Sequence, residues 1–128
     1  MSEENVEIVR KAVEAYARGD LDTALTYADP DIIWNPVEEV ASKGHDAIRA
    51  NLERWETDWE DYEATPEEHI DAGDQVLVTI HWSGRGRGSG LRVDIRTYNL
   101  YTLRDGKAIR MDEFTEQSEA LEAAGLSE

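Results

Sequence analysis

The sequence predicts a single α+β domain, in which N-terminal helices pack on a strongly curved, mixed but mainly antiparallel sheet that forms a cone around an internal pocket. Helical periodicity fills the first half of the chain and strand-like alternation fills the second, an order typical of α+β proteins. No repeat, linker or low-complexity tract divides residues 1–128, and this length is typical of one domain. Long strands that bend beneath a tryptophan-rich helix enclose an interior, so we expect a pocket.

Helical spacing of apolar residues predicts three helices in the first half of the chain. In the first helix these residues recur at i, i+3, i+7 and i+10, which places them on one face: Val6, Val9, Val13 and Tyr16. Gly19 follows as a natural stop, because helices commonly end at a residue in the left-handed conformation. The third helix carries a broad apolar stripe made of Ile48, Leu52, Trp55 and Trp59. The predicted helices span residues 2–18, 21–28 and 44–59.

Strand signals dominate after Tyr62, although a first short strand precedes the third helix. Pro66 indicates an edge strand, since proline cannot donate to a central ladder. The glycine-rich stretch 84–90 is predicted to be a loop, and Asp105-Gly106 is a strong hairpin signal. A short helix from Glu116, ending at Gly125, closes the chain. The predicted strands span residues 31–36, 62–71, 75–83, 91–103 and 107–115.

Composition excludes several classes of site. The formal charge of −16, from 13 basic and 29 acidic residues, repels a phosphate backbone, so we expect no nucleic-acid partner. The chain has no cysteine and therefore no disulfide or thiolate site. The three histidines lack metal-ligand spacing with a carboxylate, so we expect no metal. Without a membrane-length apolar run or signal-peptide pattern, we expect no membrane partner and a cytoplasmic location.

Short motifs along the chain follow one another in a recognisable order. They are Arg18-Gly-Asp20, the segment YADPDIIWNP at 27–36, Gly44-His-Asp-Ala-Ile48, Gly73-Asp-Gln-Val76, Ser89-Gly90, Arg104-Asp-Gly-Lys107 and EALEAAGL at 119–126. Together they resemble the NTF2-like superfamily, in its SnoaL-like (ketosteroid-isomerase-like) branch, over nearly the whole chain. The resemblance implies the cone fold, a cofactor-independent pocket and a homodimer formed through the outer face of the sheet. It leaves activity open, because this fold hosts several enzyme classes and pure binding modules.

The resemblance also allows catalytic positions to be compared residue by residue. Ketosteroid isomerases carry an aspartate where this chain has Asn35, which cannot act as a carboxylate base. SnoaL-type cyclases pair an acid with a histidine, and the matching residues here are Glu113 and Asn99. Limonene epoxide hydrolases resemble the chain at Glu113 and near Asn35, but they need an Arg and an Asp within the stretch matching 78–82, which here reads VTIHW. No branch therefore has its complete catalytic set in this chain.

Glu113 is the candidate catalytic residue that survives this comparison. On a strand it shares a face with Met111 and Ile109, and a lone ionised carboxylate on an apolar face is costly. We therefore expect it to be paired or to have a raised pKa. Two interpretations stay open. Glu113 acts as a general acid or base at the pocket floor, assisted by Asn99 and Asn35, or it is a structural carboxylate bonded to a buried polar side chain.

Aromatic residues and a polar strand face predict the pocket lining. Thr97, Asn99 and Tyr101 share one face of the long strand, and the aromatic residues exceed what a small core requires. The expected ligand contacts are Tyr16, Trp34, Trp55, Trp59, Trp82, Thr97, Tyr101 and Met111. His81 is interpreted as a half-exposed strand residue, and His45 and His69 as surface residues.

The leading functional hypothesis is a pocket for a small hydrophobic metabolite, with cofactor-independent acid/base chemistry of the isomerase, cyclase, lyase or hydrolase type. The alternative is a non-catalytic ligand-binding or dimeric interaction module of the same fold.

Overall fold

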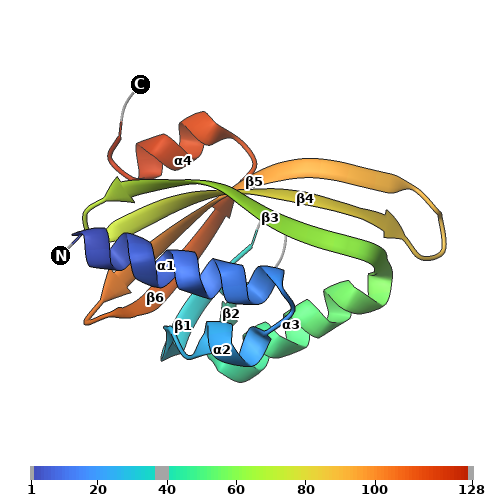
Figure 1. Cartoon of the computed structure of the whole chain (residues 1–128), viewed down its shortest axis with the longest axis horizontal. Helices are drawn as coiled ribbons and strands as arrows, with labels where there is room; N and C mark the ends of the chain where they lie inside the picture. Colours follow the sequence, from blue (N-terminus) through green and yellow to red (C-terminus); the bar gives the residue numbers. More distant parts are fainter. Residues whose placement is uncertain (1, 37–40, 127–128) are drawn as a thin grey trace.

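The computed structural model describes residues 2–36 and 41–126, apart from the side chains of Ser2 and Trp55. The helices are α1 (Ser2–Ala17), α2 (Leu21–Leu25), α3 (His45–Asp58) and α4 (Gln117–Ala123). The strands are β1 (Ala28–Asn35), β2 (Ser42–Lys43), β3 (Trp59–Ala72), β4 (Gln75–Gly86), β5 (Arg92–Arg104) and β6 (Lys107–Phe114). Figure 1 shows their arrangement, with α1 and α4 on opposite sides of a curved sheet.

The described strands form one open, mixed sheet in the order β2–β1–β6–β5–β4–β3. β1 and β6 run parallel, whereas the other neighbouring pairs run antiparallel. The predicted α+β class and the mainly antiparallel sheet are therefore confirmed. β3, the predicted edge strand, is indeed the last strand of the sheet.

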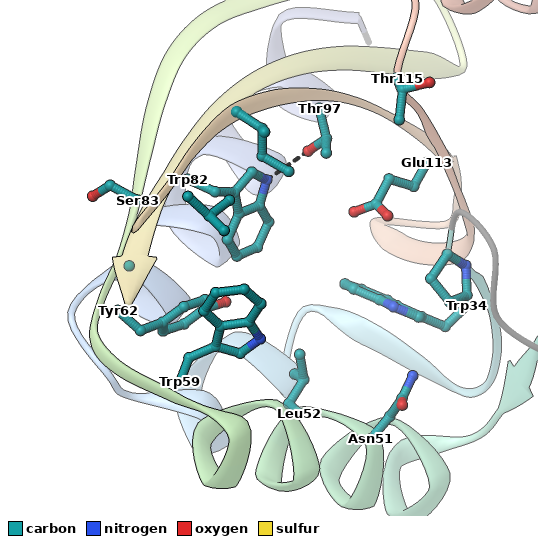
Figure 2. A pocket seen from close by; sticks show the side chains of 14 residues that line it. Trp34, Asn51, Leu52, Trp59, Tyr62, Trp82, Ser83, Thr97, Glu113 and Thr115 are labelled. Carbon is teal, nitrogen blue, oxygen red and sulfur yellow. Dashed lines mark hydrogen bonds between the residues drawn. The ribbon is translucent and has the colours of Figure 1, made fainter. Parts of the chain in front are cut away.

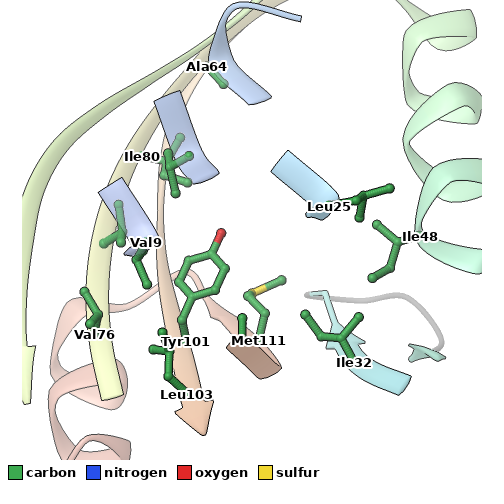
Figure 3. Packing of buried hydrophobic residues seen from close by; sticks show 13 residues of the cluster. Val9, Leu25, Ile32, Ile48, Ala64, Val76, Ile80, Tyr101, Leu103 and Met111 are labelled. Atoms are coloured by element: carbon green, nitrogen blue, oxygen red, sulfur yellow. The ribbon is translucent and has the colours of Figure 1, made fainter. Parts of the chain in front are cut away.

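Alternation along β4 divides the core between the two faces of the sheet. Val76, Val78 and Ile80 point toward α1 and join the main core, which also contains Val9, Ile32 and Met111 (Figure 3). Leu77 points the other way and packs with Leu100 and with Ala120 of α4. Because successive side chains of a strand face opposite sides, a strand covered on both faces reads as an almost continuous apolar run.

Two helices end as the sequence predicts, through glycines in the left-handed conformation. Gly19 has φ 84°, and its N–H donates to Tyr16 O while the N–H of Asp20 donates to Ala15 O. At the end of α4, Gly125 has φ 75°, and the N–H of Leu126 donates to Leu121 O at 2.8 Å. Both arrangements are Schellman motifs, which satisfy carbonyls that have no helical partner.

Long-range pairing shifts several predicted boundaries. The second helix was expected to reach Ala28, but it ends at Leu25 because Ala28 already pairs with Ala108 of β6. The predicted loop 84–90 is shorter than expected, since Trp59 pairs with Gly86 and extends the β3–β4 ladder. Neither change has a local signal in the sequence, because the partner residue lies more than twenty positions away.

Two of the three histidines, His45 and His69, are less exposed than expected. His45 is half-buried, with Nε2 3.1 Å from Ala28 O. His69 is also half-buried, and its Nε2 is a buried atom without a hydrogen-bond partner. The surface assignment of both residues was therefore wrong. His81 is half-exposed as predicted, and its Nε2 lies 2.6 Å from Asp94 Oδ1.

None of the helices in the described part of the chain combines the length and the apolar character needed to span a bilayer.

The burial of His69 makes stability depend on pH in the weakly acidic range. Burial lowers the pKa of His69 below 6.5, Arg10 lowers it further, and Glu14 and Glu7 on the same helix oppose the change. The unfolded chain therefore binds more protons once the pH falls below 6.5. The free energy of unfolding should decrease as the pH falls below 6.5, by at most about 1.4 kcal/mol per pH unit for this residue.

Urea unfolding of the wild type and of His69→Gln between neutral and weakly acidic pH measures this effect. The variant should show a flatter dependence of the free energy of unfolding on pH. Parallel curves for the two proteins would contradict the assignment.

Candidate functional site

A cavity of about 210 Å³ lies between α3 and the inner face of the sheet. Its walls come from α3 and from strands β1, β3, β4, β5 and β6, and Figure 2 shows their side chains converging on a common space. The residues that line it include Trp34, Asn51, Leu52, Trp59, Tyr62, Trp82, Thr97 and Glu113.

Glu113 reaches this cavity because of its position on β6. Met111 and Glu113 are two residues apart and share the inner face. Met111 has an exposure of 0% and belongs to the core, whereas Glu113 is half-buried and lines the cavity. Figure 2 shows the carboxyl group of Glu113 pointing toward the middle of the cavity, above the indole of Trp34. Asp112, between these two residues, accepts from Arg110 Nε at 2.8 Å.

The expected partner of Glu113 and Met111 on that face was Ile109, and this expectation was wrong. A shift of register between Thr102 and Leu103 places Ala108 in the main core instead. The extra residue of such a bulge moves the following side chains to the opposite face.

Asn35 is not in the cavity. It neighbours Trp34 on β1, and the inward direction of Trp34 sends Asn35 toward the other face. Asn35 Nδ2 donates to Asp112 Oδ1 at 3.0 Å, and the two residues are paired in the β1–β6 ladder. The expectation that Asn35 assists Glu113 is therefore corrected, because its amide is committed to a structural contact.

The polar face of β5 is satisfied by its own hydrogen bonds. Trp82 Nε1 donates to Thr97 Oγ1 at 2.6 Å, and Thr97 Oγ1 donates to Asn99 Oδ1 at 2.9 Å. Asn99 also hydrogen-bonds Tyr101 through its side chain and has an exposure of only 1%. This series of contacts gives each buried polar group a partner, as buried groups require.

Asn99 nevertheless lies beside the carboxylate. It is paired with Glu113 across the β5–β6 ladder, on the same face of the sheet. Directly opposed residues of an antiparallel pair have Cβ atoms about 5 Å apart. The two predicted catalytic positions that remain, Glu113 and Asn99, are thus neighbours, although their catalytic role stays a prediction.

A second cavity of about 70 Å³ adjoins the first and is more apolar. Tyr16, Asn99 and Tyr101 line this smaller cavity, while Trp34 and Trp82 line both. The predicted ligand contacts are therefore divided between two spaces. Met111 lines neither cavity.

Trp55 and Trp59, both assigned to the predicted helix over residues 44–59, were expected to form the walls of the pocket. Trp59 does line the larger cavity, but as the first residue of β3. The side chain of Trp55 lies outside the described part of the structure.

Tyr62 is a lining residue that the sequence did not indicate. Its hydroxyl hydrogen-bonds the hydroxyl of Tyr16, and its ring lies 5.6 Å from that of Trp82. The position depends on a bulge in β3, where the register shifts between Glu60 and Glu63 and Asp61 has φ 54°. Aspartate tolerates this conformation better than most residues, which is the only local signal.

Asn51 is a further lining residue that the sequence did not indicate. Its exposure is 6%, and its Oδ1 accepts a hydrogen bond from the guanidinium of Arg54. It lies three residues after Ile48 and so belongs to the inner face of α3, a spacing that identifies it in retrospect.

Three tyrosines near the cavity are held in the neutral form. Burial raises the pKa of Tyr62 to about 12, and the charges of Glu113 and Glu56 add to this effect. Burial likewise raises the pKa of Tyr16 and of Tyr101, and Glu113 contributes to both. A phenolate would lose its hydration here and face a carboxylate, so the proton is retained.

The only ionisable acid or base among the described lining residues of the larger cavity, apart from Tyr62, is a carboxylic acid. Among its described lining residues, Glu113 is the only carboxylate, and none is Lys, Arg or His. In the described part of the chain, no three His, Cys, Asp or Glu side chains gather into a group that could hold a metal ion.

An alkaline titration tests the buried phenols. Of the five tyrosines, Tyr16, Tyr62 and Tyr101 should stay protonated in the folded protein above pH 10, the ordinary value. Because the unfolded chain releases these protons first, the free energy of unfolding should fall as the pH rises above 10.

Ultraviolet absorbance of tyrosinate, recorded with and without denaturant, measures the difference. In Tyr62→Phe, the increase in tyrosinate absorbance on unfolding should be smaller by the contribution of one tyrosine. Ionisation of all the tyrosines of the native protein in one step near pH 10 would contradict the assignment.

The comparisons with known proteins agree with this architecture. A family model for the SnoaL-like domain matches residues 9–111 of the chain. A search of curated proteins finds no match.

Solved structures share the fold over almost the full chain. An NTF2-like protein of Burkholderia thailandensis E264 is similar with a TM-score of 0.83 and 23% identity, covering 91% of this chain and 95% of that one. An NTF2-like protein of Burkholderia pseudomallei K96243 has a TM-score of 0.80 and 21% identity, covering 93% and 95%. A candidate SnoaL-like polyketide cyclase from Jannaschia sp. CCS1 has a TM-score of 0.79 and 25% identity, covering 96% and 92%. The resemblance found in the sequence is confirmed, and the chain belongs to the SnoaL-like domain family with an NTF2-like fold.

Proposed function

We propose that the chain binds a small apolar molecule in the larger cavity and that Glu113 exchanges a proton with it. The observation that carries the proposal is a carboxyl group directed into a space whose walls include Trp34, Trp59 and Trp82. Apolar walls with a few convergent polar groups are typical of small-molecule sites. A carboxylate within reach of a bound substrate can act as a general base and then as a general acid.

The size of the cavity sets the size of the molecule. Its volume is about 210 Å³. An enclosed apolar cavity of about 150 Å³ holds benzene. A molecule with one ring and a short substituent therefore matches this space better than a fused polycyclic compound.

Tyr62 supports proton transfer next to a carbonyl group. Its hydroxyl stays neutral at physiological pH because burial raises its pKa to about 12. When Tyr16 donates to Tyr62, a ligand oxygen that accepts a hydrogen bond from the Tyr62 hydroxyl would have its developing negative charge stabilised. Glu113, on another wall of the same cavity, would remove the proton from the adjacent carbon. This pair of roles fits an isomerase, cyclase or lyase reaction without a cofactor.

A second candidate function is binding without catalysis. It is favoured by the hydrogen bonds that Trp82, Thr97 and Asn99 make with one another. Those contacts commit the polar groups of β5 to structure, and the residue opposite Glu113 on β5 is Asn99 where a SnoaL-type cyclase has a histidine.

Proton exchange distinguishes the two functions without knowledge of the natural substrate. Wild-type protein in deuterium oxide should accelerate loss of the α-protons of a single-ring ketone such as phenylacetone, followed by nuclear magnetic resonance. The carbon-bound proton passes to Glu113, and a deuteron from solvent replaces it on carbon. In Glu113→Gln this rate should fall by about 10²-fold or more, because an amide cannot accept the proton.

Glu122→Gln is the matched control, because it makes the same chemical change at an exposed position of α4. It should leave the exchange rate unchanged. A ketone that quenches tryptophan fluorescence but shows no exchange above the buffer rate would favour the binding module.

We also propose a homodimer formed through the outer face of the sheet. On this face α4 covers Leu77 and Leu100, and further along β5 Arg96 pairs with Glu67 through Nε at 2.7 Å. Both side chains of this ion pair are partly exposed and so available to a second copy.

Light scattering should give about twice the chain mass of 14.5 kDa at micromolar concentration. Arg96→Glu should weaken the dimer, since it places like charges at the contact, whereas Lys11→Glu on the exposed side of α1 should not. A wild-type monomer under these conditions would contradict the assembly.

A further inference from the structure

We infer that the small molecule bound in the larger cavity is not purely apolar but an organic cation, in which apolar substituents surround an ammonium group. The inference rests on the proposed function in one respect, namely that this cavity is the ligand site. It adds the chemical class of the ligand, which follows from the charge and the aromatic content of the walls.

The described lining of the larger cavity favours positive charge. Glu113 is a carboxylic acid in this lining, and the described lining residues include no Lys, Arg or His that would repel a cation. A cation bound here can form an ion pair with the carboxylate, which a neutral ligand of the same shape cannot form.

Aromatic rings form much of the remaining walls. Trp34 on β1, Trp59 and Tyr62 on β3 and Trp82 on β4 approach the cavity from different strands. In Figure 2 the ring of Trp34 lies on the Glu113 side, and those of Trp59, Tyr62 and Trp82 lie across the cavity from the carboxyl group. Ring faces attract cations, tryptophan most strongly, and several rings around one site bind quaternary ammonium groups.

The same walls disfavour metal ions. Calcium and magnesium require about six oxygen ligands and prefer carboxylates, and the described lining offers one carboxylate, one amide and the hydroxyls of Tyr62, Ser83, Thr97 and Thr115. The carbonyl oxygen of Asn51, the amide on α3, already accepts from Arg54. An alkylated ammonium group is weakly hydrated and needs no oxygen shell, so it fits where a metal ion does not.

Charge outside the cavity favours the same ligand. The chain carries a formal charge of −16, which raises the local concentration of cations near its surface. Inside the cavity, a bound cation would also keep Glu113 ionised, and the ionised carboxylate is the form that accepts a proton. The ligand class and the proposed proton transfer are therefore compatible.

Two compounds of almost identical shape separate charge from apolar contact. Trimethylphenylammonium and tert-butylbenzene differ by a nitrogen cation in place of a carbon atom. Binding of each to the wild type would be followed by tryptophan fluorescence and by isothermal titration calorimetry. The cation should bind at least about tenfold tighter than its neutral isostere.

Variants then assign the preference to residues. Glu113→Gln should lose about tenfold in affinity for the cation while its affinity for tert-butylbenzene changes less than about twofold. Trp59→Leu should also reduce the preference, because it keeps an apolar wall and removes the ring face. Glu122→Gln removes one negative charge, as Glu113→Gln does, but at a distant site, and it should behave like the wild type.

The outcomes separate this inference from the proposed function. If tert-butylbenzene binds as tightly as the cation or tighter, the ligand class is wrong while the apolar site stands. If neither compound binds at millimolar concentration, the ligand site itself is wrong and both proposals fail. The comparison in the wild type decides the question even if a variant does not fold, and thermal unfolding by circular dichroism identifies such a variant.

Discussion

The alternation of side chains along the central strands is the constraint on which the rest of the structure depends. On β6 it sends Met111 and Glu113 inward and Asp112 outward, and the neighbouring strand obeys the same rule at Asn99. A change of register by one residue would exchange the two faces, placing Glu113 against α4 and Asp112 in the cavity. The register is fixed because each face is covered by different helices and has its own apolar set.

The polar groups near the cavity have different roles because they differ in burial. Thr97 and Asn99 lie in the interior with an exposure of 5% and 1%, and they satisfy one another together with the indole of Trp82. Such a satisfied network holds rings and strand in one arrangement, since breaking any contact would leave a buried group without a partner. The chemical character of the cavity then comes from the carboxyl group of Glu113, which points into it.

Local signals predicted the fold class and most elements, because helix and strand periods, glycine stops and the Asp105-Gly106 turn act over a few residues. The type of turn is visible in the structure, with φ 52° and 77° at these two positions. Boundaries that depend on distant partners were misplaced, as at Ala28, which pairs with Ala108, and at Gly86, which pairs with Trp59. The candidate acid at Glu113 was predicted, whereas Tyr62 and Asn51 were not.

The sequence by itself determined the α+β class, the inward face of β5 and the presence of an acid on the last strand, since each follows from spacing within one element. Only the tertiary structure decided which of these residues meet. It placed Asn99 beside Glu113 and directed Asn35 to the opposite face of the sheet. It also brought Tyr62 to the wall of the larger cavity through a bulge in β3. The physical reason is that register between strands and bulges within them arise from packing of the whole sheet, which no local pattern encodes.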